Sequence, residues 1–226
     1  GYFNLFYIEK RKKYSRLDGL SLVLHIEGAQ AVRLMHDREI LAERTLEGLE
    51  QEGEYVFELP YHRCESGVFW FSLKVSDAPG ESGRKWPKVR GFFDGNVTAP
   101  RPVSIAAVIC TYRREAYVIR NLACLKEIFE NTALEAASHL QVFLVDNGQT
   151  LEENAQVQQL KRQCGGRVLI FKNPNAGGAG GFTRGMLEAL KRREAKGLTH
   201  VLLMDDDAVF EPDLFVRLYG FLAALK

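Results

Sequence analysis

The sequence predicts two successive domains: an all-β, sandwich-like domain over residues 1–97 and an α/β domain with a mainly parallel sheet over residues 98–226. Apolar residues alternate with other residues along the first part, whereas short apolar strands alternate with helical patterns in the second. Between the two parts, residues 94–102 carry two prolines and several turn formers. This composition is typical of a linker.

The first part contains three stretches with the period of two that suits a strand with one buried face, at residues 20–26, 55–59 and 69–75. Turn-forming residues separate these stretches, at 52–53, 65–67 and 77–80. Short strands at such close intervals favour a small antiparallel sandwich or barrel.

In the second part, four continuous apolar runs predict buried strands at residues 103–109, 142–145, 168–171 and 200–204. Helical spacing of Ile119, Leu122, Leu125 and Phe129 predicts a helix after the first strand. A second helix is expected over roughly residues 181–195 and a third from near Glu211. Strands that alternate with helices form a mainly parallel sheet covered on both faces.

Polar or glycine-rich residues directly follow each of the four predicted strands. In open parallel sheets, ligands bind outside the carboxyl ends of the strands. We therefore expect one crevice at this edge, formed by residues 110–113, 146–148, 173–178 and 205–207.

Three consecutive carboxylates, Asp205, Asp206 and Asp207, end the last of these strands. Unpaired carboxylates at one strand end repel one another and lose hydration, so a cation is expected beside them. In an extended or turn-like backbone, Asp205 and Asp207 project to one side while Asp206 points back into the protein. Two hard oxygen ligands with open positions suit a Mg²⁺ or Mn²⁺ ion that also holds phosphates. The alternative is an acidic turn that caps the helix near Glu211.

The segment NPNAGGAGGFTRG, residues 173–185, joins the third strand to a helix. Gly177, Gly178, Gly180 and Gly181 allow close backbone approach, and the N–H groups at the start of the helix, with Arg184 nearby, can receive an anion. The segment matches neither of the familiar phosphate-binding patterns, GxGxxG and GxxxxGK[ST]. The alternative is a flexible loop without a ligand.

Two further strand ends carry candidates. Asp146 can accept a hydrogen bond from a nucleobase or a ribose, or it can form an Asx turn with Asn147 and Gly148. Arg113 and Arg114 can meet phosphate charge, or they can be ordinary surface arginines at a helix start.

The composition limits the class of protein. Thirty basic and twenty-nine acidic residues give a net charge of +1, which argues against nucleic acid as a partner. Four cysteines without a CxxC pair argue against a zinc knuckle and fit a reducing compartment. The N-terminus lacks the pattern of a signal peptide, so a cytoplasmic location is expected.

Four motifs stand at the strand ends in order: ICTYRR, VDNG, NPNAGGAGGFTRG and MDDD. With them, residues 103–213, about half of the chain, resemble the GT-A fold nucleotide-sugar glycosyltransferases of the large inverting family two. The glycine-rich segment, the triple aspartate and the β-rich part in front look most like galactofuranosyltransferases that build galactan chains. Residues 1–95 match that arrangement in architecture only.

The resemblance implies a UDP-sugar site with a divalent ion, Mn²⁺ or Mg²⁺. Thr111 and Arg113 would line the nucleotide pocket, and Asp146 would contact the base. Asp205 and Asp207 would hold the metal ion against the diphosphate. The residues implied in donor binding are Thr111, Arg113, Asp146, Gly177, Gly178, Arg184 and Asp205.

The resemblance also implies a catalytic base beyond the acidic motif, but this chain ends at Lys226 after one more helix. We therefore expect a truncated GT-A, Rossmann-like half domain without its acceptor half, and the catalytic residue is not assigned.

The expected function is metal-dependent transfer of a sugar, with galactofuranose as one candidate, from a UDP-sugar to a glycan or lipid-linked glycan, with inversion. Peripheral association with the inner face of a membrane is left open, as are the sugar, the linkage and the oligomeric state. Two alternatives stand beside this function. One is a phosphatase with an aspartyl nucleophile, although Ala208-Val209 replaces the Gly-Thr of such enzymes. The other is a non-catalytic glycan-binding module.

Overall fold

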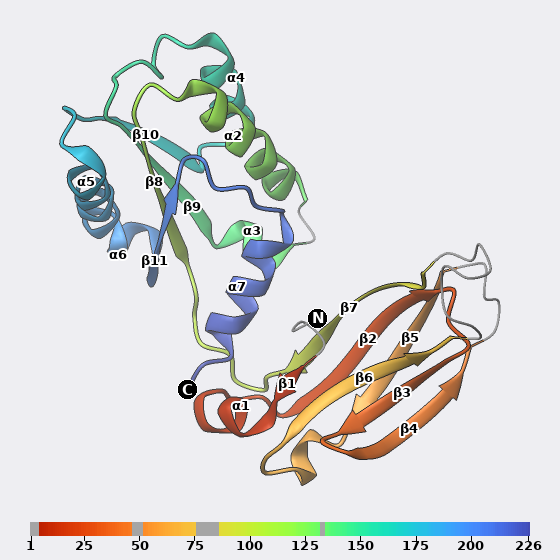
Figure 1. The fold of residues 1–226 in the computed structure, drawn as a ribbon. Coiled ribbons are helices and arrows are strands. Elements are labelled where there is room, and N and C mark those ends of the chain that lie inside the picture. The colour runs from red at the N-terminus through yellow and green to blue at the C-terminus, as the bar shows by residue number, and fades with distance from the viewer. Residues whose placement is uncertain (1–4, 47–51, 76–85, 132–133) are drawn as a thin grey trace. The chain divides into compact units, whose positions relative to one another are not determined.

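The computed structural model describes residues 5–46, 52–75, 86–131 and 134–226. The chain divides into two compact units, Gly1–Pro100 with Ala224–Lys226 and Arg101–Ala223 (Figure 1). The last three residues, which the sequence analysis assigned to the second domain, belong to the first unit. The Ala224 carbonyl accepts a hydrogen bond from the Arg16 N–H, and Leu225 forms a β-bridge with Ser15.

The first unit contains two antiparallel sheets, with strand orders β1-β6-β3-β4 and β5-β2-β7. The strands are β1 (Phe6–Tyr7), β2 (Gly19–Glu27), β3 (Ala31–His36), β4 (Glu39–Thr45), β5 (Gly53–Leu59), β6 (Val68–Lys74) and β7 (Lys88–Asn96). β2, β5 and β6 match the three predicted strands. The turn predicted at residues 77–80 lies outside the described residues.

One hydrophobic core lies between the inner faces of these two sheets. Every second residue of β2 enters it, as the alternating pattern requires, and β3, β5 and β6 contribute from their own inner positions. The unit also contains helix α1 (Ile8–Tyr14), whose first residue is fully buried in this core, and the short 3₁₀ helix η2 (Tyr61–Arg63). The description of this part as all-β therefore omits a helix.

Four strands of the first unit were not predicted: β1, β3, β4 and β7. All residues of β4 except Leu41 are exposed, so this edge strand has no clear alternation of apolar and polar residues. β7 continues to Asn96, because Asp94, Gly95 and Asn96 pair with the first three residues of β2. The prediction of a linker over residues 94–102 is therefore wrong for its first three positions.

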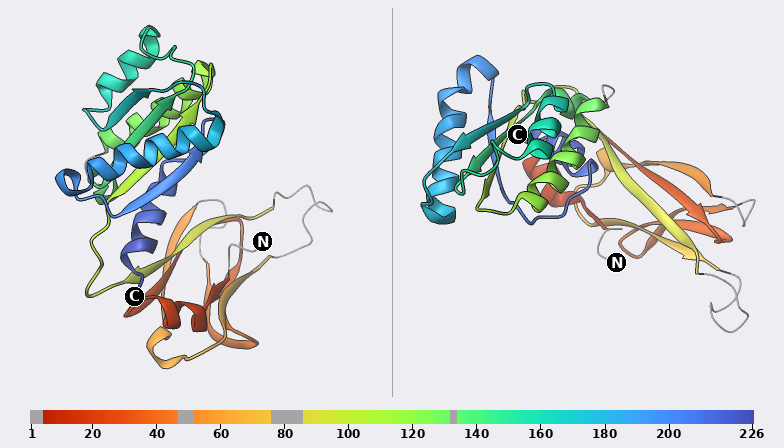
Figure 2. Two further views of the ribbon diagram at one scale, coloured as in Figure 1. Left: turned by 90° about the vertical axis from the view of Figure 1, so that its left-hand side faces the viewer. Right: turned by 90° about the horizontal axis from the view of Figure 1, so that it is seen from above.

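The second unit contains one four-stranded parallel sheet, in the order β10-β9-β8-β11 (Figure 2). Its strands are β8 (Ile105–Thr111), β9 (Leu140–Asp146), β10 (Val168–Lys172) and β11 (His200–Asp205), close to the predicted ranges. Its helices are α2 (Glu115–Glu130), α3 (Glu135–Ser138), α4 (Ala155–Gln163), α5 (Gly177–Lys191), α6 (Arg193–Lys196) and α7 (Asp213–Ala223). No helix among the described residues is long and apolar enough to span a membrane.

Helices cover both faces of this sheet, as the continuous apolar strands predict. On one face, Ile105, Ala107 and Ile109 of β8 share a core with α2, α4 and α7. On the other face, Ala106 and Val108 pack with residues of α5. Because all four strands are parallel, their carboxyl ends lie at one edge of the sheet.

Helix α5 begins at Gly177, four residues before the predicted start, so most of the glycine-rich segment is helical. Glycine disfavours helix in isolation, but packing on the sheet requires it here. A Cβ atom at Gly181 would overlap Cys110 Sγ, and a Cβ atom at Gly185 would overlap Val108 Cγ1. The glycines therefore let α5 lie directly against β8.

We predict that Gly185→Ala destabilises the second unit by about 1–2 kcal/mol, because overpacking of a core outweighs the gain in helix propensity. Gly220→Ala is the matched control, since Gly220 lies in α7, is exposed, and has open space around its would-be Cβ. This control should stabilise the unit by about 0.5–1 kcal/mol. Urea unfolding of the two variants measures both effects, and equal stability of the two would contradict the prediction.

Candidate functional site

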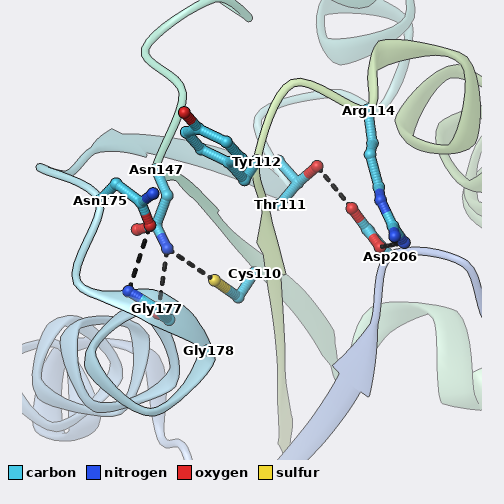
Figure 3. A pocket seen from close by; sticks show the side chains of 9 residues that line it. All are labelled: Cys110, Thr111, Tyr112, Arg114, Asn147, Asn175, Gly177, Gly178 and Asp206. Atoms are coloured by element: carbon cyan, nitrogen blue, oxygen red, sulfur yellow. Dashed lines mark hydrogen bonds and ion pairs between the residues drawn. The ribbon is translucent and has the colours of Figure 1, made fainter.

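A cavity of about 380 Å³ lies at the carboxyl ends of the parallel strands in the second unit (Figure 3). Residues from the ends of β8 and β9, from the start of α5 and from the turn after β11 line it. They are Cys110, Thr111, Tyr112, Arg114, Asn147, Asn175, Gly177, Gly178 and Asp206. This is the edge at which the sequence predicts a crevice.

The start of α5 forms one wall of the cavity. Gly177 has a φ of +66°, which favours glycine, and a Cβ atom at Gly177 or Gly178 would meet nothing within 4 Å. Asn175 Oδ1 accepts a hydrogen bond from the Gly177 N–H, and Asn147 Nδ2 donates to the Gly177 carbonyl. Ala176 at the N-cap has no side-chain acceptor, so no N-cap side chain pairs with the N–H groups that follow Gly177. Gly178, the next residue, lines the cavity. This wall is suited to an anion.

Asp206 and Arg114 lie across the cavity from that turn (Figure 3). Asp206 is 6% exposed. Its carboxylate accepts a hydrogen bond from Thr111 Oγ1 at 2.7 Å and another from Arg114 Nη1 at 3.2 Å. The charge of Asp206, followed by the hydrogen bonds to Asp207 and Asp206, raises the pKa of Arg114, so the guanidinium stays charged. Asp206 thus points back into the protein, as the sequence analysis expects.

Helix α2 also holds the backbone of the acidic motif. Asn121 Nδ2 donates to the Asp206 carbonyl at 2.8 Å, and Arg120 Nη2 donates to the carbonyls of Asp207 and Ala208. The guanidinium groups of Arg114 and Arg120 both contact the ring of Tyr117, at 5.6 and 5.3 Å from its centroid. These contacts fix the position of the turn after β11.

Asp205 and Asp207, the predicted metal ligands, are exposed and do not line the cavity. Asp207 Oδ2 forms an ion pair with Arg114 Nη1 at 3.1 Å. No group of three or more His, Cys, Asp or Glu residues that could hold a metal ion occurs in the described part of the chain. The two exposed carboxylates still offer hard oxygen donors beside the cavity, so their chemistry fits Mg²⁺ or Mn²⁺ with open positions for phosphate oxygens.

Of the other residues predicted to bind the donor, Thr111, Gly177 and Gly178 line the cavity, whereas Arg113, Asp146 and Arg184 do not. The Asp146 carboxylate is fully buried and accepts hydrogen bonds from the backbone N–H groups of Gly148 and Leu151. It therefore forms the Asx turn that the sequence analysis left as an alternative.

Arg184 is turned toward its own helix. Its Nε atom lies 3.2 Å from Glu188 Oε1, without the alignment of a hydrogen bond. The buried Glu188 carboxylate also pairs with Lys191 and Arg192, and the pKa of Glu188 is lowered, mainly by the hydrogen bond from Lys191. Arg113 has a positive φ of 53° and places its guanidinium 5.4 Å from the centroid of the Tyr112 ring.

Six of the nine lining residues were not among the donor-binding residues that the resemblance implies: Cys110, Tyr112, Arg114, Asn147, Asn175 and Asp206. Arg114 was a candidate for phosphate charge, and the other five lie in the ranges expected to form the crevice. Each lies at or just after the end of a strand, so the strand-end rule contained the signal. Tyr112 is 46% exposed and offers an aromatic face to a ligand. Burial, followed by the charges of Asp206 and Asp205, raises the pKa of the Cys110 thiol.

The Thr111–Asp206 hydrogen bond leads to a prediction about stability. Thr111→Val should destabilise the second unit by about 1–3 kcal/mol, because a buried carboxylate loses a hydrogen-bond donor. Thr111→Ser keeps the hydroxyl and is the control. Urea unfolding at pH 7 checks the pair, and an equal loss in both variants would assign the effect to packing instead of the hydrogen bond.

Residues 100–225 match the model of a family described as glycosyltransferase like family 2. Galactofuranosyltransferase GlfT2 of Mycolicibacterium smegmatis is 28% identical over 225 residues, which cover 96% of this chain and 32% of that protein. GlfT2 of Mycobacterium tuberculosis is 26% identical over 231 residues, with 96% of this chain and 33% of that protein covered. Among solved structures, Staphylococcus aureus TarS 1-349 aligns with a TM-score of 0.39 and 14% identity over 53% of this chain and 32% of that one.

The chain thus spans about a third of the length of the curated relatives that it matches. The family match covers more than half of this chain and includes the parallel sheet and every residue that lines the cavity. The chain belongs to glycosyltransferase family 2.

Proposed function

We propose that this chain binds a UDP-sugar in the cavity of its second unit, with Mn²⁺ or Mg²⁺, as part of an inverting glycosyltransferase with a GT-A fold. The observation that carries the proposal is the pairing of two walls across one cavity: the uncapped start of α5 and the acidic motif after β11. A helix N-terminus binds anions such as a diphosphate, and carboxylates bind divalent cations, so a nucleoside diphosphate with its metal ion suits both walls. Family membership supports the same reaction class.

In the proposed complex, the N–H groups that follow Gly177 in the first turn of α5 donate to the diphosphate, because the Gly177 N–H already donates to Asn175 Oδ1. Gly178 has no side chain, and open space surrounds its Cα, so a phosphate can approach the backbone closely. The exposed ring of Tyr112 offers a stacking surface to the uracil. Asn147 and Asn175 brace the turn through their contacts with Gly177.

Asp205 and Asp207 would hold the metal ion. When bound there, a divalent ion neutralises the negative charge that develops on the leaving diphosphate. Asp206 would keep its place through Thr111, Arg114 and Asn121, which hold the turn that carries its two neighbours. One buried carboxylate thus positions two exposed ones.

In the proposed transfer, the acceptor oxygen forms a bond to C1 of the sugar as the bond from C1 to the diphosphate oxygen breaks, which inverts C1. The acceptor proton goes to a base that we do not assign. Asp206 is not a candidate, because it is buried and already accepts hydrogen bonds from Thr111 and Arg114.

Galactofuranose is the sugar that we propose, because two relatives that align with most of this chain are named galactofuranosyltransferases. The proposed acceptor is a glycan or a lipid-linked glycan, and the proposed location is the cytoplasm, with peripheral membrane association left open. Family membership favours a transferase over the phosphatase that the triple aspartate alone allows.

The proposed donor site predicts coupled binding of UDP and the metal. With excess MnCl₂, UDP at about 100 times its dissociation constant should stabilise the second unit by about 2.7 kcal/mol, measured as a rise in melting temperature. In EDTA the rise should be small. In MnCl₂, Asp205→Ala and Asp207→Ala should each reduce the rise in melting temperature. Asp213→Ala, which removes an acidic residue from α7 instead, should leave the rise unchanged. A UDP effect that survives both EDTA and Asp207→Ala would count against the proposal.

The position of Cys110 provides a footprint of the same site. Cys110 lines the cavity, whereas Cys64 lies in the first unit, and both are partly buried and free. We expect UDP with MnCl₂ to slow alkylation of Cys110 by N-ethylmaleimide at least severalfold and to leave the rate at Cys64 unchanged. Mass spectrometry of peptides measures both rates at once. Equal protection of both thiols, or of neither, would argue against a ligand in this cavity.

A further inference from the structure

Asp206 and Asp207, neighbours in the acidic motif, are held in different ways. Asp206 is buried and anchored by Thr111 and Asn121. The side chain of Asp207 is 54% exposed, and among the described residues its carboxylate forms one ion pair, with Arg114 at 3.1 Å. Among the described residues, both ion pairs on the three carboxylates come from Arg114.

We propose that Arg114 is the internal cation of the acidic motif, and that a divalent ion must take Asp207 from it. The inference rests on the proposed function, because it assumes that Asp207 is a ligand of that ion. Arg114 then lowers the affinity of the free protein for the metal ion. Without the metal ion, its positive charge compensates part of the negative charge of the three carboxylates. Its pairing with Asp206 remains after the exchange.

The energetics allow such an exchange. An ion pair between side chains that are both about half exposed is weak, since water and salt screen it. The bond to Asp206 is better protected, because that carboxylate is buried and has a second donor in Thr111. Asp207 is therefore the oxygen ligand that can change partners without disturbing the anchored part of the motif.

Arg120 supplies a matched comparison. It lies in α2, directly before which Arg114 stands as the N-cap residue, and it contacts the same Tyr117 ring and carries the same charge. It donates to the backbone carbonyls of Asp207 and Ala208, however, and not to a carboxylate. Loss of Arg120 removes a positive charge near the motif while the Arg114–Asp207 pair stays.

The test is the affinity of the full chain for Mn²⁺ alone, measured by electron paramagnetic resonance of the free ion in wild type, Arg114→Gln and Arg120→Gln. Arg114→Gln should bind Mn²⁺ about three- to tenfold more tightly than wild type, because a weak competing pair and a nearby positive charge are removed. Arg120→Gln should show a smaller increase or none. Arg114→Lys, which keeps the charge but not the planar donor pair, should lie between wild type and Arg114→Gln.

A second measurement does not require the metal. In EDTA, Arg114→Gln should lower the melting temperature of the wild-type protein more than that of an Asp207→Asn variant, because the pair is already lost there. If Arg114→Gln lowers the melting temperature equally in wild type and in the Asp207→Asn variant, Arg114 is not the internal cation of the motif. Equal gains in Mn²⁺ affinity for Arg114→Gln and Arg120→Gln would reduce its role to a general charge effect, and weaker binding by Arg114→Gln would overturn the competition.

The outcomes also separate this inference from the proposed function. If wild type binds Mn²⁺ but Arg114→Gln binds it no more tightly, the inference fails and the metal site stands. If wild type binds no Mn²⁺ and Arg114→Gln does, the inference stands and metal use by the native site fails. If neither protein binds Mn²⁺, both fail.

Discussion

The buried carboxylate of Asp206 is the constraint on which the candidate site depends. A charge that is only 6% exposed must be compensated inside the protein, and here the partners come from distant parts of the chain. Thr111 ends β8, Arg114 precedes α2, and Asn121 lies within α2 and binds the Asp206 backbone. Burial of one residue therefore brings the first strand, the first helix of the unit and the acidic turn together.

A second constraint acts from the opposite side of the cavity. Helix α5 can direct its first turn at the strand ends only because Gly181 and Gly185 let it lie against β8. A side chain at either position would push the helix outward and open the wall that Gly177 and Gly178 form. Close packing and the position of the uncapped N–H groups are thus one structural feature.

Residues of the same type have different roles in the acidic motif because their environments differ. Asp206 has two side-chain donors and is part of the scaffold, whereas Asp205 and Asp207 remain exposed at the surface. Asp146 repeats the first case, because its buried carboxylate organises the turn after β9. A carboxylate at a strand end is therefore a candidate ligand only when its hydrogen-bonding capacity is not already used within the fold.

The sequence by itself determined the strands of the parallel sheet, the class of the second unit and the edge at which a cavity forms. Continuous apolar runs, helical spacing and polar residues after each strand are local patterns, and they persist whatever surrounds them. It also carried the motifs of the family. It did not predict β1, β3, β4 and β7. β1 has only two residues, the exposed edge strand β4 lacks clear alternation, and β7 runs into residues that look like a linker.

Only the tertiary structure decided which side chains at that edge face the cavity. Asp146 and Arg184 pair with nearby backbone and side-chain groups. Arg114, for which the sequence left open either a phosphate contact or an ordinary surface position, contacts two aspartates more than ninety positions away. The start of α5 was likewise set by packing, because glycines that disfavour a helix in isolation permit it against β8. Such choices depend on contacts between distant segments, which no local pattern encodes.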